Sequence, residues 1–179
     1  MRAEDILTFW FETLKPVDWF RKSEPLDQQI VTDFMPAHEQ LVAGELVAWR
    51  DQPAGWLAQI ILLDQFSRNM FRGSPQSFAY DALALFLAQQ AIHEGIADSF
   101  PHAQRTFIYM PYMHSESLLI QKQGLILFAT VENPRTFSFA QQHHDIIARF
   151  GRFPHRNALL GRASSAEEQA FLQQPGSSF

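Results

Sequence analysis

Residues 60–73 read IILLDQFSRNMFRG, a stretch that joins an apolar run to polar residues at helical spacing. At about 100° per residue, its polar side chains fall within an arc of about 140°. They are Asp64, Gln65, Arg68, Asn69 and Arg72. The arc contains no lysine or glutamate, the usual residues of a solvent-facing stripe, and its side chains have fixed donor and acceptor geometry. We therefore expect a helix whose polar face lines an interior site.

Helical patterns occupy the chain on both sides of this stretch. Apolar residues recur at helical spacing, and prolines, glycines and capping residues mark the ends of the segments. The expected helices cover 3–14, 25–49, 55–72, 75–94, 101–109, 111–131, 136–150 and a last segment that follows a capping box at 164–168. Pro36 must kink or split the second helix, because proline removes a backbone hydrogen bond and clashes with the preceding turn.

No segment alternates between apolar and polar residues with the period of a strand. Apolar residues make up 46% of the chain and aromatic residues 13%, which supports a substantial core. Connections between the helical segments are short, so successive helices are expected to lie antiparallel. The sequence thus predicts one all-α domain over residues 1–179, an antiparallel array of about seven to nine helices.

Charge and composition argue against several classes of protein. The net charge is −5, and we find no basic stripe of the kind that nucleic-acid domains carry. No window approaches 18 uninterrupted apolar residues, so no membrane span is expected. Cysteine is absent, which excludes disulfides and thiolate metal sites. Glu4 and Asp5 stand where a signal peptide needs positive charge, so we expect a cytoplasmic protein without nucleic-acid or membrane partners.

The segment 75–94 is apolar nearly all round, which predicts a helix buried in the middle of the domain. Asp81 is its only charged residue before the last turn. Because a buried unpaired carboxylate is very unfavourable, Asp81 should be paired with an arginine or a histidine.

A second polar stretch, residues 143–157, reads HHDIIARFGRFPHRN. Arginine suits planar, two-pronged recognition of carboxylate or phosphate, and several arginines tied to few acids would leave a net positive pocket. We expect Asp145 and Arg149 to join Asp64 and Arg68 in one polar cluster that binds a small anion. The further candidates for this site are His114, Glu116, His144, Arg152, His155, Arg156 and Asn157.

Other chemistries have weaker signals. His114 and Glu116, with His144 and Asp145, could supply metal ligands, but the first two point about 200° apart on a helix and no His-Glu-x-x-His motif occurs, so no metal site is predicted. Ser115 is a conceivable nucleophile without a recognisable surrounding motif. No cofactor fingerprint is present, so no cofactor is expected.

Three functions remain open on the residues alone. The first is a pocket between helices that binds a small phosphate or carboxylate. The second is a hydrolase that uses the same pocket, with His114 or His144 as general base and the arginines as electrophilic stabilisers. The third is an interaction scaffold whose concave helical face binds a protein segment. Arginine–aspartate networks also serve as purely structural clasps, so catalytic residues stay unassigned.

Three motifs in order carry a family resemblance: LLDQFSRNMFRG (62–73), YMPYMHSES (109–117) and RFGRFPHRNALLGR (149–162). The chain resembles, over nearly its whole length, an uncharacterised bacterial family known as domain of unknown function 924. Ser67 stands where that family usually has proline. The resemblance implies an all-helical fold related to the tetratricopeptide-repeat superhelix, with helical hairpins and a concave face. It implies no established activity and no catalytic residues.

Overall fold

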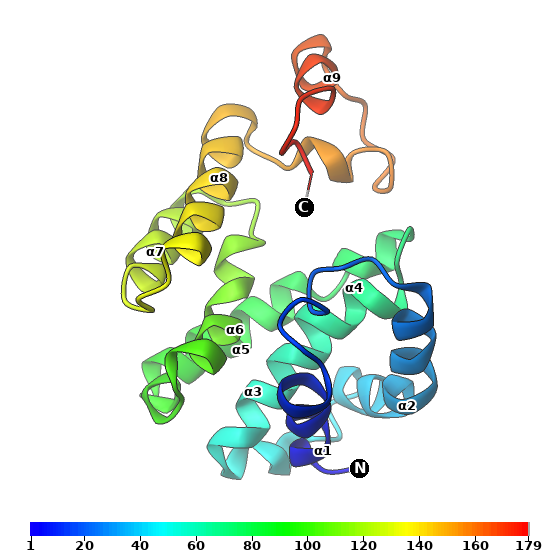
Figure 1. Ribbon diagram of the computed structural model, residues 1–179, viewed down its shortest axis with the longest axis vertical. Helices are drawn as coiled ribbons and strands as arrows, with labels where there is room; N and C mark the ends of the chain where they lie inside the picture. The colour runs from blue at the N-terminus through cyan, green and yellow to red at the C-terminus, as the bar shows by residue number, and fades with distance from the viewer. Residues whose placement is uncertain (179) are drawn as a thin grey trace.

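The computed structural model describes residues 1–178, which form helices and turns without a strand, so the all-α prediction is confirmed (Figure 1). The α-helices are α1 (Ala3–Thr8), α2 (Glu24–Val42), α3 (Pro53–Ile61), α4 (Ser67–Met70), α5 (Asp81–His93), α6 (His102–Met113), α7 (Leu118–Phe128), α8 (Pro134–Phe150) and α9 (Ala166–Leu172). Two π-helical turns, Phe9–Thr13 and Leu62–Phe66, extend α1 and join α3 to α4. Turns of 3₁₀ helix cover Val47–Asp51, Pro75–Phe78, Ile96–Ser99 and Pro154–Arg156.

The expected central helix exists as one continuous rod made of α3, the π-turn and α4. Its apolar side chains from Leu57 to Phe66 are fully buried, because α1, α5 and α6 all pack against α3. Gly55 allows the rod to start close to the preceding 3₁₀ turn, where a Cβ would lie 1.8 Å from the carbonyl oxygen of Trp49. The start of the stretch 60–73 therefore lies at the centre of the fold.

Aromatic side chains join the N-terminal residues to this rod. The ring of Trp10 is fully buried, with its centroid 5.4 Å from that of Phe66 and 5.8 Å from that of Phe107 on α6. Trp19 closes the same cluster, since its indole N–H donates to the carbonyl of Trp10 at 2.7 Å. Such ring pairs add about 1 kcal/mol each beyond their burial, so the cluster fixes α1 against α6.

Prolines lie inside two of the helices. Pro36 does not split α2, which runs from Glu24 to Val42. The prediction that a helix ends before Pro111 was wrong, because α6 contains Pro111 in its last turn. The expected helix over 111–131 is instead interrupted at 114–117. Gln121 of α7 explains the interruption, because its buried amide donates to the carbonyls of Met113 (2.7 Å) and Ser115 (2.8 Å), which a helix end leaves without partners.

Helix α5 is less central than predicted. It packs against α3 and α6, but Leu83 and Phe86 on its other side are 38% and 51% exposed. The segment also starts later than expected, since Ser74 and Pro75 open a 3₁₀ turn, and α5 begins only at Asp81. Asp81 therefore sits at the end of the helix, where it can reach other elements.

The C-terminal part packs partly on itself. Helices α7 and α8 lie side by side, and at the end of α8 Ile146 and Ile147 form a second small core with Phe153, with Phe150 and Phe171 at its edge. Figure 1 shows the two helices next to each other. The capping box predicted for the last helix is present, with Ser165 and Glu168 exchanging hydrogen bonds. None of the helices in residues 1–178 has the length and apolar character needed to cross a membrane.

Candidate functional site

The π-turn divides the polar arc of the central rod between two neighbours. Asp64 and Arg68 face α5 and the end of α6, where they contact Asp81 and His114. Asn69 and Arg72 face α2 instead. Single π-turns inside α-helices are frequent at functional sites, because the extra residue redirects the side chains around it. The arc that the sequence predicted as one face thus serves two separate places.

Asp64 and His114 form a buried hydrogen-bonded pair. Nδ1 of His114 lies 2.7 Å from Oδ1 of Asp64, whose side chain is 1% exposed, and the amide of Gln65 donates to Oδ2. Burial alone would raise the pKa of Asp64, but His114 and Arg68 outweigh it and hold the pKa below its ordinary value. Burial also lowers the pKa of His114, against the attraction of Asp64. The pair is therefore a carboxylate and a neutral imidazole whose Nδ1–H donates to it.

Asp81 is paired, as predicted for a lone acid on an apolar helix. It accepts two hydrogen bonds from Arg68, at 3.0 and 3.2 Å, and one from Arg156 at 2.9 Å. Arg68 in turn donates to the backbone carbonyl of Asp64 at 2.6 Å. Asp81 therefore ties the central rod to the 3₁₀ turn Pro154–Arg156, which lies 75 residues along the chain.

Arg156 is held flat between two aromatic rings. Its guanidinium carbon lies 4.5 Å from the centroid of Phe78 and 4.7 Å from that of Phe153, and the residue is 6% exposed. Besides its bond to Asp81, it donates to the backbone carbonyl of His114 at 3.0 Å. These contacts fix the guanidinium in one orientation next to the backbone of His114.

Glu116 fastens the C-terminal segment to the turn between α6 and α7. It accepts two hydrogen bonds from Arg162, at 2.6 and 2.9 Å, and one from the backbone N–H of Phe153 at 2.7 Å. Arg162 also donates to Asn157 at 2.9 Å. The turn 114–117 separates α6 from α7 and carries both His114 and Glu116. Glu116 holds the C-terminal segment against this turn.

A cavity of about 510 Å³, which we call the His114 cavity, opens beside this network. Most of its walls are apolar, and the polar groups gather where the 114–116 turn meets the start of α5 and the 154–160 segment. The lining residues are Pro75, Phe78, Ala79, Asp81, Ala82, Leu85, His114, Ser115, Glu116, Arg156 and Leu160. A mainly apolar cavity of this size with a few convergent polar groups is the usual form of a small-molecule site.

The expected surplus of positive charge is not found in this network. Its three guanidiniums belong to Arg68, Arg156 and Arg162, and its three carboxylates to Asp64, Asp81 and Glu116. With His114 neutral, these charges balance. The expectation of a net positive pocket therefore has to be corrected, because each arginine of the network is tied to an acid.

Asp145 and Arg149 do not join Asp64 and Arg68, so the prediction of one shared cluster was wrong. Asp145 is 78% exposed and contacts the neighbouring His144 at 3.0 Å. Arg149 pairs with Glu167 at 2.8 Å. Helical periodicity correctly placed these side chains on one arc, but that arc faces solvent and α9, because the opposite arc packs on α7 and on the second small core.

Two further candidates lie close to the network without lining the cavity. Arg152 pairs with Glu168 of α9, at 2.6 and 2.8 Å. His155 packs beside Phe153, with ring centroids 5.6 Å apart, and burial lowers its pKa to about 4. Both residues support the C-terminal segment that carries Arg156.

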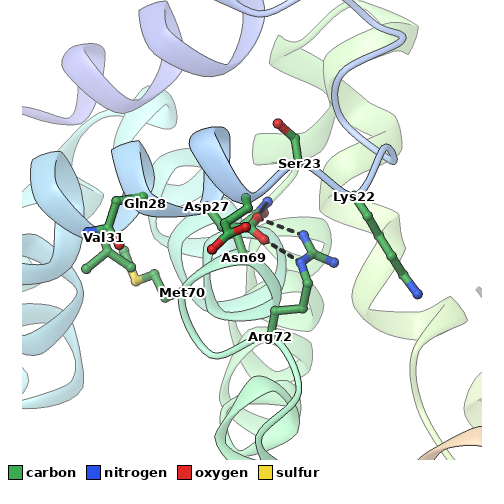
Figure 2. A pocket seen from close by; sticks show the side chains of 9 residues that line it. Lys22, Ser23, Asp27, Gln28, Val31, Asn69, Met70 and Arg72 are labelled. Atoms are coloured by element: carbon green, nitrogen blue, oxygen red, sulfur yellow. Dashed lines mark hydrogen bonds and ion pairs between the residues drawn. The ribbon is translucent and has the colours of Figure 1, made fainter.

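Asn69 and Arg72 belong to a second cavity, of about 460 Å³, next to the start of α2 (Figure 2). Figure 2 shows both side chains directed at Asp27, which accepts a hydrogen bond from each at 2.8 Å. The sequence pattern does not single out Asp27, because an acid in the first turn of a helix has a sufficient local explanation in the helix dipole. Nor does it single out Phe78, which carries no polar signal at all.

Residues 1–178 contain no group of three or more acidic or histidine side chains placed to hold a metal ion. The side chains here that can take part in acid–base or nucleophilic chemistry include the Asp64–His114 pair, Arg156 and Ser115.

Comparisons with known proteins agree with the motifs noted in the sequence. A family model described as bacterial protein of unknown function, DUF924, matches residues 6–176. A solved structure of a protein of unknown function from Agrobacterium tumefaciens is similar to this one, with a TM-score of 0.91 and 37% sequence identity, over 96% of each chain. Comparison with curated proteins gives no match. The chain thus belongs to the bacterial family of unknown function DUF924.

Proposed function

We propose that the chain binds a small molecule with an apolar body and a carboxylate head in the His114 cavity. The observation that carries this proposal is the lining of the cavity, where the oriented guanidinium of Arg156 lies among the polar groups at one end and the remaining walls are apolar. Two hydrogen bonds engage one N–H on each terminal nitrogen of Arg156, which leaves donors for a ligand. The apolar walls would then cover the body of the ligand.

The balance of charge favours a carboxylate over a phosphate. Phosphate sites collect several uncompensated cations or a metal, because the group carries close to two negative charges. Here Asp81 and Glu116 line the cavity together with Arg156, so a dianion would meet two carboxylates for one guanidinium. A monoanion beside the neutral ring of His114 meets less repulsion.

A protein segment fits this cavity less well than a small molecule does. Interfaces with proteins usually bury about 800 Å² on each partner, over a surface much broader than a single pocket. A volume of about 510 Å³ lies instead within the range of small-ligand sites, about 300–1,000 Å³. The small-molecule function is therefore the one that the cavity supports best.

Benzoate tests this function, because it combines an apolar ring with one carboxylate. We expect benzoate to raise the melting temperature at constant ionic strength, and benzyl alcohol and phosphate to raise it less, since a ligand that binds only the folded state stabilises it by mass action. Ligand-observed NMR would check that benzoate contacts the protein directly.

Filling the cavity should abolish this effect. Ala82 lines the cavity and is exposed, so Ala82→Phe would occupy the space without disturbing the core. Ala148→Phe on the exposed face of α8 is the matched control. Benzoate should stabilise the Ala148→Phe variant as it does the unmodified chain, but not the Ala82→Phe variant. Equal stabilisation of both variants would contradict the proposed site.

A further inference from the structure

We infer that the Asp64–His114 pair hydrolyses carboxylic esters bound in the His114 cavity, with His114 as general base. This inference rests on the proposed function, because the carboxylate that the cavity binds would be one product of the reaction. It goes further in assigning a reaction, a catalytic residue and a positioning residue. The arrangement that carries it is a cavity-lining imidazole whose inner nitrogen is bonded to a buried carboxylate.

The hydrogen bond to Asp64 determines which nitrogen of His114 can act as a base. Nδ1 carries the proton and donates to Oδ1 of Asp64 at 2.7 Å, so the lone pair is on Nε2. Asp64 is fully buried and is oriented by Gln65, so the carboxylate holds the ring in one tautomer and one position. Asp64 therefore acts through His114 and is a positioning residue, as the buried acid is in serine-hydrolase triads.

The charges around the ring keep it available as a base. Asp64 and Arg68 of the central rod and Asp81 of α5 act on the ring, and the ring of His143 on α8 lies 6.1 Å away. Arg156 of the 3₁₀ turn Pro154–Arg156 donates to the backbone carbonyl of His114 rather than to its ring. Burial, together with Arg68, outweighs the attraction of the two carboxylates and lowers the pKa of His114. The imidazole is therefore unprotonated at neutral pH.

The reaction needs only water and the ester. Nε2 of His114 takes a proton from a water molecule as the water oxygen attacks the carbonyl carbon, and the carbonyl electron pair moves onto its oxygen. Arg156, which already recognises the carboxylate head, stabilises this oxyanion. The intermediate then re-forms the C=O bond and breaks the C–O bond to the alcohol, which leaves with the proton from Nε2. The products are a carboxylic acid and an alcohol, and His114 is neutral again.

Water is assigned as the nucleophile because Ser115, which follows His114 in the chain, makes no hydrogen bond with its ring in the described part of the structure. A serine nucleophile has to lie within hydrogen-bond reach of the imidazole that activates it. Attack by water predicts that the alcohol is released at a constant rate from the first turnover. Attack by serine would give an initial burst as the acyl-enzyme accumulates.

Hydrolysis of p-nitrophenyl butyrate by the purified full chain tests the inference. General-base catalysis contributes about 10²–10⁴-fold, so we expect His114→Gln to lower the rate above background by at least tenfold. His93→Gln removes an exposed histidine far from the cavity and should leave the rate unchanged, which controls for the reactivity of free imidazole. Circular dichroism would establish that the variants are folded.

Two measurements keep the test independent of whether His114→Gln folds. Ala82→Phe should lower the rate and Ala148→Phe should not, because only the first fills the cavity. The pH at which the rate of the unmodified chain falls to half its plateau should lie below 6.5, since burial lowers the pKa of His114 from its ordinary value of 6.5.

The outcomes separate this inference from the proposed function. Loss of hydrolysis in His114→Gln and in Ala82→Phe, without a burst in the unmodified chain, supports both. A burst overturns the attack by water. Hydrolysis no faster than that of free imidazole, or lost equally in His93→Gln, overturns the inference, and benzoate binding that Ala82→Phe abolishes would then leave the proposed function intact. Absence of both hydrolysis and benzoate binding overturns both.

Discussion

Acidification from pH 8 to pH 5 should lower the free energy of unfolding by about 6 kcal/mol, through three histidines that the fold keeps neutral. Burial lowers the pKa of His38 to about 4, that of His143 to about 3 and that of His155 to about 4, all from the ordinary value of 6.5. At pH 5 the unfolded chain protonates these rings and the folded chain does not. Each ring then favours unfolding by about 2 kcal/mol.

The sign and the pH range follow from the two pKa values of each ring. The unfolded state binds more protons between the folded value and 6.5, so stability is fully present above pH 6.5 and is lost as the pH falls below it. Ordinary carboxylates are still mostly ionised at pH 5, so the histidines dominate this range. Because typical domains are stable by only about 5–15 kcal/mol, we expect part of the protein to be unfolded at pH 5.

Urea unfolding at both pH values measures the effect, and His38→Gln provides an internal check. His38 contacts Ser67 at 2.9 Å, so this variant will be less stable than the unmodified chain at pH 8. Between pH 8 and pH 5, the free energy of unfolding of this variant should nevertheless fall by only about 4 kcal/mol, since one titrating ring is gone. If the free energy of unfolding of the unmodified chain fell by less than about 2 kcal/mol between pH 8 and pH 5, the histidine rings would be protonated in the folded state as well. That result would contradict the lowered pKa values of the three rings.

Replacement of Asp81 by asparagine should lower the free energy of unfolding by about 3 kcal/mol or more, because it leaves Arg68 and Arg156 without their shared carboxylate. Asparagine keeps the shape of the side chain but not its charge. The two guanidiniums would then repel each other in a partly buried place, and Arg156 would lose the contact that sets its orientation.

Asp145→Asn is the matched control, because Asp145 carries the same charge on an exposed helix face and contacts only His144. Surface ion pairs contribute little, so this change should leave the urea midpoint nearly unchanged. Equal effects of the two substitutions would mean that water solvates Asp81 as well as it solvates Asp145. The clamp between the central rod and the C-terminal segment would then have no energetic importance.

Periodicity and charge were enough to predict part of this structure. The helical stretch from residue 60 follows from the sequence, and so does the burial of Asp64, Gln65 and Asn69, because few sequences place rigid polar side chains opposite a continuous apolar run. The single interior face does not follow, since Arg72 is exposed and turns to α2. The pairing of Asp81 also follows, since an isolated acid in an apolar segment must find a cation. These predictions depend only on residues close together in the chain.

The errors concern contacts between distant segments. The prediction that Asp145 and Arg149 share one face of a helix was correct. The sequence does not say which neighbour that face meets, and here it faces solvent and α9. The interruption at 114–117 depends on Gln121, whose amide satisfies the carbonyls at the end of α6. The pairing of Asp81 with Arg156 joins residues 75 apart in the chain, and that of Glu116 with Arg162 joins residues 46 apart. Local patterns carry no information about such pairings.

Nitrogen NMR of the imidazoles at pH 7 measures the protonation state of the His114 ring, with His114→Gln to assign the signal. We expect a neutral ring with the proton on Nδ1, and an Nε2 signal that shifts when benzoate enters the cavity. A ring protonated on both nitrogens, a proton on Nε2, or an Nε2 signal that does not respond to benzoate would contradict this expectation.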